Sequence, residues 1–539
     1  MPDILETNAR ERGEAVLAYH RQTKHRLDGY AAGPETLDWD AQPSPYRHYA
    51  GAPVTPLKLV SDGIETPYAG LTGQAQSSPV MLGRRGVGAM LELGFGLAAI
   101  KEYGPDRWAL RCNPSSGNLH PTEVYVLACG VAGVADGVHH YRPEDHALEQ
   151  RCKTRFAQPG LWVALSSVSW REAWKYGERA FRYCQLDIGH ALGALAASCA
   201  ALGWYARIVP GIGTEALGGL LGLDRALDFG CAEREEPEVL LHIETTPGAG
   251  ASAYGLAPRL IGQAVWSGIA NLLDARPIYR WPVIEAVAKA SRGMSKSMEL
   301  HGGAPDSPAP LARAAEVILK RRSAQRYARD HVMPRSDFVR LLDAVSQLLR
   351  GTRLHLLVFA HNVEGVERGL YALPGNLAAE LGLRAGLDAA FLWDEIVAMP
   401  ELPAFKLLAK GDFRKLARAL ACRQAIAADA CVTICMLAEF GDVIAKIPWC
   451  YRQLHWQAGL VGQRLYLEAQ ALGHGGTGIG CFLDDEVHRL LGMRDESLQV
   501  VYCFAVGLAL TDTRIGTLCA YPARSRHEAE DASARDPLP

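Results

Sequence analysis

The sequence predicts an α+β fold in which two tandem copies of one domain pack together as a pseudo-dimer. The chain has 539 residues, and a single hydrophobic core stops growing at roughly 250–300 residues. Landmark residues recur at a constant offset of 270 positions, and each half contains one strand–turn–strand pattern. Together these observations favour a duplicated domain over one large one.

The repeat is clearest around a helix that we predict in each half. Arg182 and Gly189 have their counterparts in Arg452 and Gly459. The tripeptides Ala-Leu-Gly and Leu-Leu-Gly follow the same offset, at 201–203 and 471–473 and at 220–222 and 490–492. Upstream, the segments 124–141 and 354–371 each have the pattern of a strand, a turn and a second short strand. The competing interpretation is two unrelated segments of similar composition.

The predicted helices indicate how the halves pack. Residues 189–203 are small or apolar nearly all round, and residues 459–473 are similar with more polar positions. A helix of this composition is buried rather than amphipathic, and small residues suit a close contact between two helices. We therefore expect the halves to resemble a fused homodimer that is monomeric as a chain.

The local composition indicates where the domain boundaries lie. Residues 291–310 are rich in Ser, Gly and Pro, which is typical of a linker. Residues 522–539 are polar and lack an apolar period, which is typical of disorder. We predict an N-terminal extension at 1–55, a first domain at 56–265, a linker at 266–310, a second domain at 311–521 and a disordered tail at 522–539.

Composition also excludes several classes of function. The net charge is −3 and 49% of residues are hydrophobic, so nothing favours a nucleic-acid or membrane partner. The first twenty residues lack the apolar run of a signal peptide, and no stretch of about 18 apolar residues predicts a membrane helix. Thirteen cysteines occur without a Cys-x-x-Cys pair, which argues against a metal site and for reduced thiols in a cytoplasmic protein.

The two halves differ in a loop before the first strand of each. The first half contains Pro114, Ser115, Ser116, Gly117 and Asn118, whereas the second half runs from a helix through 350–352 straight into its strand. A Pro-Ser-Ser-Gly-Asn loop offers backbone N–H groups, hydroxyls and an amide to a planar ligand that is rich in heteroatoms. Taken alone, such a loop is also compatible with an ordinary turn.

The second half contains Arg321, Arg322, Ser323 and Gln325 near its start. Two guanidinium groups beside a hydroxyl suit a phosphate, although a solvated basic helix end has the same composition. The first half has the weaker sequence 20–25, His-Arg-Gln-Thr-Lys-His, at the matching place. Each half thus contributes one part of a ligand site, which predicts one complete site at the interface and a poor mirror site.

These motifs resemble those of the FMN-dependent nitroreductase superfamily, and most closely its azoline-dehydrogenase branch of the SagB/ThcOx type. The resemblance implies two nitroreductase-like domains, each a central mixed β-sheet flanked by helices. It implies that Arg321, Arg322, Ser323 and Gln325 hold the FMN phosphate. It further implies that the flavin ring is contacted by the loop with Pro114, Ser115, Ser116 and Asn118 and by Gly478 and Gly480 of a Gly-rich loop.

One position departs from the family pattern. Gln325 stands where the family usually has a basic residue, which removes one charge from the phosphate site. Arg322, Arg326 or Arg514 could compensate, and Asp512-Thr513-Arg514 resembles an Asp-x-Arg stretch whose arginine reaches the phosphate in the family. The resemblance covers roughly residues 15–265 and 311–520.

Lys175 and Tyr176 resemble a Lys-Tyr pair of the azoline dehydrogenases. The resemblance implies that they are catalytic, because oxidation of a thiazoline or oxazoline ring removes a C–H proton. A lysine in an apolar, cationic environment can have a lowered pKa and act as the base, and a neighbouring tyrosine can relay a proton. The competing interpretation is an exposed lysine beside a packing tyrosine. The second half has Pro448-Trp449-Cys450 at this place.

Three functions are compatible with these patterns. The first is an FMN-dependent dehydrogenase that oxidises an azoline or related heterocycle, free or borne on a peptide, with NAD(P)H or oxygen as redox partner. The second is an NAD(P)H-dependent nitro- or quinone reductase, and the third is a non-catalytic flavin-binding scaffold. A Rossmann site is disfavoured because the glycines at 473–480 follow a helix and lack the Gly-x-Gly-x-x-Gly spacing.

Overall fold

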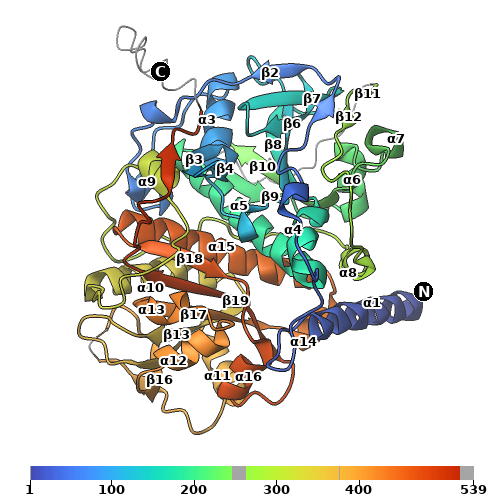
Figure 1. The fold of residues 1–539 in the computed structure, drawn as a ribbon. Coiled ribbons are helices and arrows are strands. Elements are labelled where there is room, and N and C mark those ends of the chain that lie inside the picture. The colour runs from blue at the N-terminus through green and yellow to red at the C-terminus, as the bar shows by residue number, and fades with distance from the viewer. Residues whose placement is uncertain (1, 246–262, 376, 398, 522–539) are drawn as a thin grey trace.

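The protein consists of two halves, each built on one β-sheet, in a computed structural model that describes residues 2–245, 263–375, 377–397 and 399–521. Figure 1 shows the first half above the second, with helices α5 (Ala180–Ala201) and α15 (Cys450–Ala471) side by side between the sheets. The predicted disordered tail, 522–539, lies outside the described residues.

The first-half sheet has the strand order β11-β7-β6-β5-β8-β10-β9, with β2 paired to β7. Its strands are β2 (Val54–Pro56), β5 (Thr122–Cys129), β6 (Gly137–Arg142), β7 (Ala147–Lys153), β8 (Gly160–Ser167), β9 (Tyr205–Ile208), β10 (Glu236–Glu244) and β11 (Val265–Trp266). The helices of this half besides α5 are α2 (Tyr68–Leu71), α3 (Arg84–Phe95), α4 (Ser169–Tyr176), α6 (Thr214–Leu221) and α7 (Ala226–Phe229).

The second-half sheet has the order β15-β16-β14-β13-β17-β19-β18. Its strands are β13 (Leu354–Ala360), β14 (Gly369–Leu373), β15 (Asp394–Glu395), β16 (Lys406–Lys410), β17 (Val432–Glu439), β18 (Gly475–Ile479) and β19 (Leu498–Gly507). The helices of this half besides α15 are α9 (Ala314–Lys320), α10 (Arg335–Leu349), α11 (Leu377–Gly386), α12 (Arg414–Leu420), α13 (Ile426–Asp429), α14 (Gly441–Lys446) and α16 (Asp484–Leu490).

The two sheets share one core order, which bears out the predicted duplication. The order β6-β5-β8-β10-β9 in the first half matches β14-β13-β17-β19-β18 in the second. Helices α5 and α15 begin and end 270 positions apart, as the sequence repeat requires. The strand–turn–strand patterns predicted at 124–141 and 354–371 are β5 with β6 and β13 with β14.

The prediction of a mixed sheet was wrong for the described strands of both sheets, because every pairing between them is antiparallel. Short turns join β5 to β6 and β13 to β14, and a short turn pairs consecutive strands in opposite directions. A parallel contact occurs at the edge, where an isolated bridge joins Ser323 to Gly476.

Helices α5 and α15 form the contact that holds the halves together. Nearly every residue of α5 is buried, in agreement with its composition, and its glycines allow the two backbones to approach closely. A Cβ atom on Gly189 would lie 2.3 Å from the carbonyl oxygen of Trp456, and one on Gly459 would lie 2.2 Å from that of Leu186. The repeated glycines are therefore the residues on which the helix crossing depends.

The segments outside the two predicted domains also cross between the halves. Helix α1 (Pro2–Gln22), within the predicted extension, packs against α14 of the second half and against α8 (Pro282–Ala290). The predicted linker thus contains a helix, and it also contains the short strand β12 (Ile269–Ala270), which pairs with β1 (Tyr49–Ala50).

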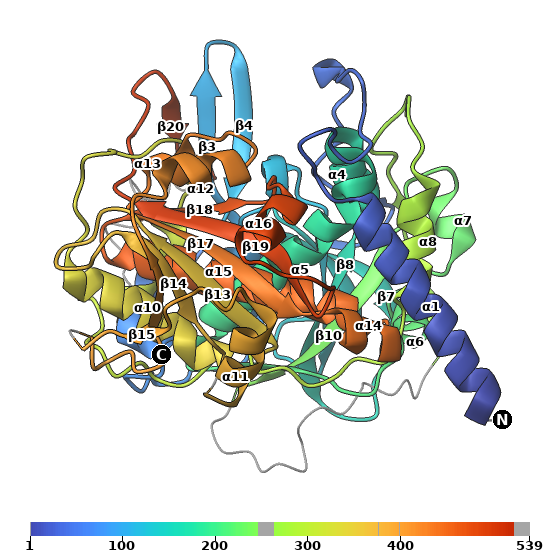
Figure 2. The same cartoon turned by 90° about the horizontal axis from the view of Figure 1, so that it is seen from below.

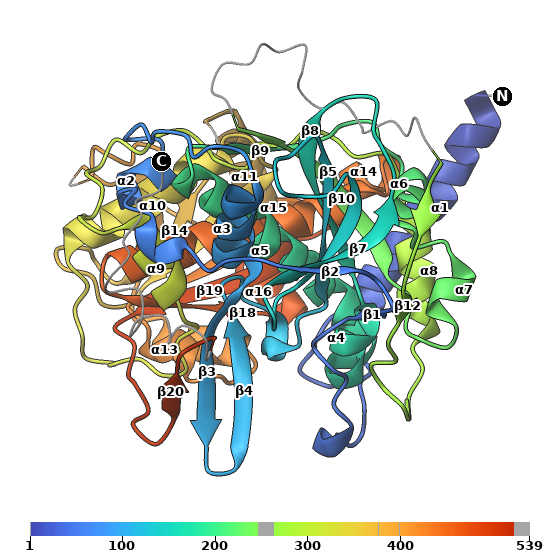
Figure 3. The ribbon, with the colours of Figure 1, turned by 90° about the horizontal axis from the view of Figure 1, so that it is seen from above.

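A hairpin projects from the body of the first half, as Figures 2 and 3 show. It consists of β3 (Leu97–Tyr103) and β4 (Asp106–Arg111), and β20 (Gly516–Leu518) from the end of the chain adds a third antiparallel strand. The second half thus reaches back to the first, and the loop that follows β4 is held near the interface.

The crossing of α5 and α15 predicts a specific stability defect. We expect Gly189→Ala to lower the free energy of unfolding by about 1–3 kcal/mol, because the methyl group overpacks a contact between two backbones. The matched control is Gly382→Ala in α11, where a Cβ atom meets nothing within 4 Å and alanine should stabilise the helix by about 0.5–1 kcal/mol. Urea denaturation of both variants measures the difference. Equal stability of the two variants would contradict the proposed role of the glycine contact.

Candidate functional site

A cavity of ≈ 660 Å³ lies at the interface of the two halves. The first half supplies the β3–β4 hairpin, the loop 113–118 and one face of α5 to its lining. The second half supplies residues 320–325, part of α15, the Gly-rich segment 473–481 and residues 508–512. Drug-sized ligands and cofactors occupy cavities of about 300–1,000 Å³, so the volume suits a cofactor.

Arg321 and Arg322 bring positive charge to this cavity from the end of α9. The Arg321 side chain donates to the carbonyl oxygens of Cys112 at 3.1 Å and Arg111 at 3.2 Å, both in the first half. Its Nη1 atom is buried without a hydrogen-bond partner among the described residues. Burial lowers the pKa of Arg321, and burial with the neighbouring Arg321 charge lowers the pKa of Arg322 to about 10.

Neither arginine forms an ion pair with a carboxylate among the described residues. Arg322 instead donates to backbone oxygens, including that of Ala98 at 3.1 Å in the first half. A buried and a partly buried cation side by side without a counter-charge are unfavourable unless an anion completes the site. The arginine pair therefore fits a phosphate or another anionic group.

Ser323 and Gln325 also line the cavity. The Ser323 hydroxyl lies 2.9 Å from the Tyr466 hydroxyl on α15, and the bridge from Ser323 to Gly476 fixes this segment along the edge of the sheet. Of the three arginines considered as replacements for the missing base at 325, only Arg322 lines the cavity.

Arg514 lies outside the lining of the cavity. Its side chain is 71% exposed and forms a two-pronged ion pair with Asp512, at 2.9 Å and 2.6 Å. The carboxylate that precedes it in the motif thus neutralises the guanidinium. The structure does not bring Arg514 together with Arg321 and Arg322.

The loop with Pro114, Ser115, Ser116 and Asn118 lines the same cavity as the arginine pair. Gly117 and Asn118 adopt left-handed backbone conformations, with φ of 60° and 61°. A Cβ atom on Gly117 would lie 2.6 Å from the Tyr176 hydroxyl, so a side chain has no room there. The backbone N–H of Ser116 donates to the Asp187 carboxylate at 3.1 Å, and its hydroxyl donates at 2.9 Å.

Asp187 was missed by the sequence analysis. It lies on α5, lines the cavity, and is followed on the same helix face by His190 and preceded by Tyr183. Burial raises the pKa of Asp187 to about 7, although hydrogen bonds from Ser115 and Ser116 favour its charged form. A carboxyl group with this pKa can hold or release a proton near neutral pH. The i, i+4, i+7 spacing of Tyr183, Asp187 and His190, which places three polar residues on one helix face, was the signal available in the sequence.

Lys175 and Tyr176 end helix α4 beside the same loop. Tyr176 lines the cavity, whereas Lys175 lies behind Gly117, with its Nζ 5.4 Å from the ring centroids of both Trp39 and Tyr176. Burial lowers the pKa of Lys175, and the nearby Glu172 opposes this shift. Lys175 is thus half-buried among aromatic rings rather than exposed.

The Gly-rich segment supplies Gly478 and Gly480 to the lining. The Gly478 N–H donates to the Tyr466 hydroxyl at 2.9 Å, and the Gly480 carbonyl accepts from Tyr183 and Arg179 at 3.2 Å each. A Cβ atom on Gly480 would lie 2.3 Å from the Tyr183 ring. Only glycine lets the backbone pass this close to the ring.

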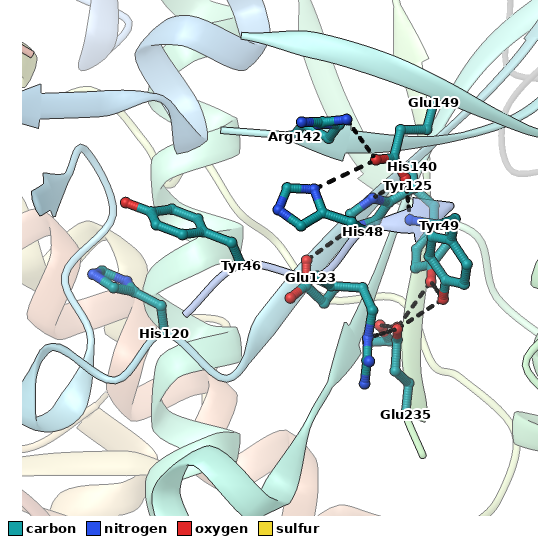
Figure 4. A network of polar contacts seen from close by, with 12 residues as sticks. Tyr46, His48, Tyr49, His120, Glu123, Tyr125, His140, Arg142, Glu149 and Glu235 are labelled. Carbon is teal, nitrogen blue, oxygen red and sulfur yellow. Dashed lines mark hydrogen bonds and ion pairs between the residues drawn. The ribbon is translucent and has the colours of Figure 1, made fainter. Parts of the chain in front are cut away.

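A buried polar network lies behind the serine loop and fixes its position (Figure 4). Arg171 donates to the carbonyl oxygen of His120, at the end of the loop, and to the Glu123 carboxylate, at 2.7 Å and 2.5 Å. His140 joins Glu123 to Glu149, at 2.8 Å and 3.5 Å. Although burial opposes the charge, the two carboxylates raise the pKa of His140 to about 9. The network is thus held together by charge at neutral pH.

The mirror position between the halves is filled. A residual cavity of ≈ 20 Å³ is lined by Ala196 and Leu460, which stand 270 positions from Tyr466 and His190 of the large cavity. A space of this size holds about one water molecule. Among the described residues, these two related positions thus differ, since one borders a cavity of cofactor size and the other does not.

Comparison with known proteins identifies the class of fold. Residues 318–508 match the sequence model of the Nitroreductase family. A crystal structure from Anabaena variabilis, provisionally named a nitroreductase, superposes with a TM-score of 0.66 at 21% identity and covers 92% of this chain and 99% of its own. The chain therefore has the nitroreductase fold across both halves.

The residues that match the Nitroreductase family model, 318–508, lie in the second half. A curated Methanocaldococcus jannaschii protein, also provisionally named a nitroreductase, is 30% identical over 99 residues, which cover 16% of this chain. The chain spans about half the length of this relative. Among the described residues, no helix is long and apolar enough to cross a membrane.

Proposed function

We propose that the protein is an FMN-dependent oxidoreductase with one FMN site at the interface of its halves. The observation that carries this proposal is the pairing of Arg321 and Arg322, which lack a carboxylate partner among the described residues, with the serine loop of the other half. A planar ring system joined to a phosphate matches such a site, because it needs an anion site at one end and a polar loop at the other.

Different residues would contact different parts of FMN. Arg321, Arg322 and Ser323 would hold the phosphate, with Gln325 as a neutral neighbour. The loop with Pro114, Ser115, Ser116 and Asn118 and the glycines Gly478 and Gly480 would contact the remainder of the cofactor. When bound, FMN supplies two-electron chemistry by accepting a hydride at N5. The filled mirror cavity supports a single FMN in each chain.

For the reaction we propose oxidation of an azoline or a related heterocycle, free or borne on a peptide. Such an oxidation removes a C–H proton in addition to a hydride. Lys175, whose pKa is lowered by burial, would accept this proton by way of Tyr176, which lines the cavity and would relay the proton or position the substrate. Asp187, whose pKa is about 7, would hold the serine loop in place and exchange protons with it.

The phosphate assignment predicts which arginines matter for cofactor binding. We expect Arg321→Ala and Arg322→Ala each to weaken FMN binding by roughly 10- to 100-fold, because each removes a charge-assisted hydrogen bond worth about 1.5–3 kcal/mol. Quenching of flavin fluorescence on titration of the apoprotein measures the dissociation constant.

The matched control is Arg514→Ala, which removes an exposed arginine already paired with Asp512. We expect this variant to bind FMN like the unaltered protein. The phosphate assignment would be wrong if Arg514→Ala weakened binding as much as Arg321→Ala.

The base assignment predicts a selective loss of activity. General base catalysis contributes about 10²- to 10⁴-fold, so we expect Lys175→Ala to lower azoline turnover by at least about 100-fold while FMN binding persists. Lys153→Ala, at an exposed position of β7, serves as the control. Two results together would favour a simple reductase instead. The unaltered protein would not oxidise azolines, and Lys175→Ala would reduce nitro compounds with NAD(P)H as fast as the unaltered protein does.

A further inference from the structure

Two cysteines lie on neighbouring loops, and one of them lines the cavity. The loop after α12 contains Cys422 and the loop after β18 contains Cys481. The loops run side by side, since the Leu483 N–H donates to the Leu420 carbonyl at 2.7 Å and the Gln424 side chain donates to the Cys481 carbonyl at 3.2 Å. Cys481 lines the cavity, and both cysteines are partly accessible.

The Cys481 thiol lies in an environment that favours its thiolate. A hydrogen bond with Cys422 lowers the pKa of Cys481 to about 5, against the effect of burial, and His25 and Arg179 act in the same direction. The same contact raises the pKa of Cys422. The pair thus resembles a dithiol in which one sulfur is the nucleophile and the other remains protonated.

His25 and Arg179 come to Cys481 from two separate segments of the chain. His25 follows α1 and bridges to Leu483, two residues beyond Cys481. Its Nδ1 accepts a hydrogen bond from the Ala31 N–H at 3.1 Å, which leaves Nε2 as the ring nitrogen free for another contact. Arg179, between α4 and α5, donates to the Gly480 carbonyl at 3.2 Å. The Arg179 guanidinium thus contacts the backbone directly before Cys481.

Other cysteines of the chain lack this combination. Cys231 and Cys519 are exposed, while the close pair Cys435 and Cys503 is buried between β17 and β19, with its sulfurs 2.9 Å apart. A thiol–disulfide exchange site of this kind needs two neighbouring thiols, of which at least one is accessible to the disulfide.

We propose that Cys422 and Cys481 form a thiol–disulfide exchange site for small disulfides that enter the cavity. The Cys481 thiolate attacks one sulfur of the small disulfide, which forms a mixed disulfide and releases one thiolate. Cys422 then loses its proton and attacks the Cys481 sulfur, which forms the Cys422–Cys481 disulfide and releases the second thiolate. The cysteine pair is oxidised by two electrons and the small disulfide is reduced by two, with two small thiols as products.

The test uses the full-length protein and bis(2-hydroxyethyl) disulfide, a small and uncharged probe. We expect Cys481 to react roughly tenfold or more faster than Cys231 and Cys519 at neutral pH, because the thiolate is the reacting form. Mass spectrometry should then show the loss of two hydrogen atoms without a retained adduct, and peptide mapping should join Cys422 to Cys481.

Two variants separate the roles of the sulfurs. Cys422→Ser should keep the mixed disulfide on Cys481, because no second thiol resolves it, and Cys481→Ser should abolish the fast reaction. Modification of Cys481 no faster than that of Cys231, or adducts that persist on both cysteines of the unaltered protein, would overturn the proposal. The reaction is run with and without added FMN, because Cys481 lines the cavity to which FMN is assigned. The reaction without FMN requires neither the cofactor nor any oxidoreductase activity, so its outcomes are distinct from the tests of the proposed function.

Discussion

The close crossing of α5 and α15 is the constraint on which the rest of the structure depends. Gly189 and Gly459 let the two backbones meet where any side chain would collide. The crossing fixes the distance between the sheets and brings Asp187 on α5 within the same cavity as Tyr466 on α15. Both halves line this cavity. Its shape therefore depends on how closely the two helices bring the halves together.

Duplication within one chain allowed the two interface positions to become different. One position keeps an open cavity with an arginine pair from the second half and a serine loop from the first. At the other position, Ala196 and Leu460 border a residual space of ≈ 20 Å³. A homodimer must build both sites from one sequence, because its symmetry repeats every residue. A fused chain is free of this constraint, and the filled mirror position contributes packing instead.

The arginines near the interface differ in whether a carboxylate neutralises them. Carboxylates compensate the buried arginines behind the serine loop, as Glu123 does for Arg171. Arg321 and Arg322 lack such partners among the described residues. Arg321 and Arg322 stand out because they line a cavity of cofactor size without a carboxylate partner among the described residues, which suits an anionic ligand.

The sequence alone predicted the duplication, because a constant offset between matching residues is visible without a structure. It also singled out two short polar motifs that the fold brings to one cavity, and their role in ligand binding stays a prediction. It assigned mixed sheets, because the order and direction of strands depend on pairings that motifs do not encode. Asp187 was missed because its carboxyl group acquires its role from burial beside a loop distant in the sequence. Arg514 was included because its motif does not reveal that Asp512 already holds the guanidinium. The thiol pair joins residues 422 and 481, whose proximity only the fold creates.

The central claim is that two specialised halves build one cofactor site. Native mass spectrometry of the purified protein, reconstituted with excess FMN and then freed of unbound cofactor, tests it most directly. The account predicts a monomer of 58.4 kDa that carries one FMN and releases it on denaturation. A chain that binds two FMN molecules, or a folded chain that binds none, would contradict it.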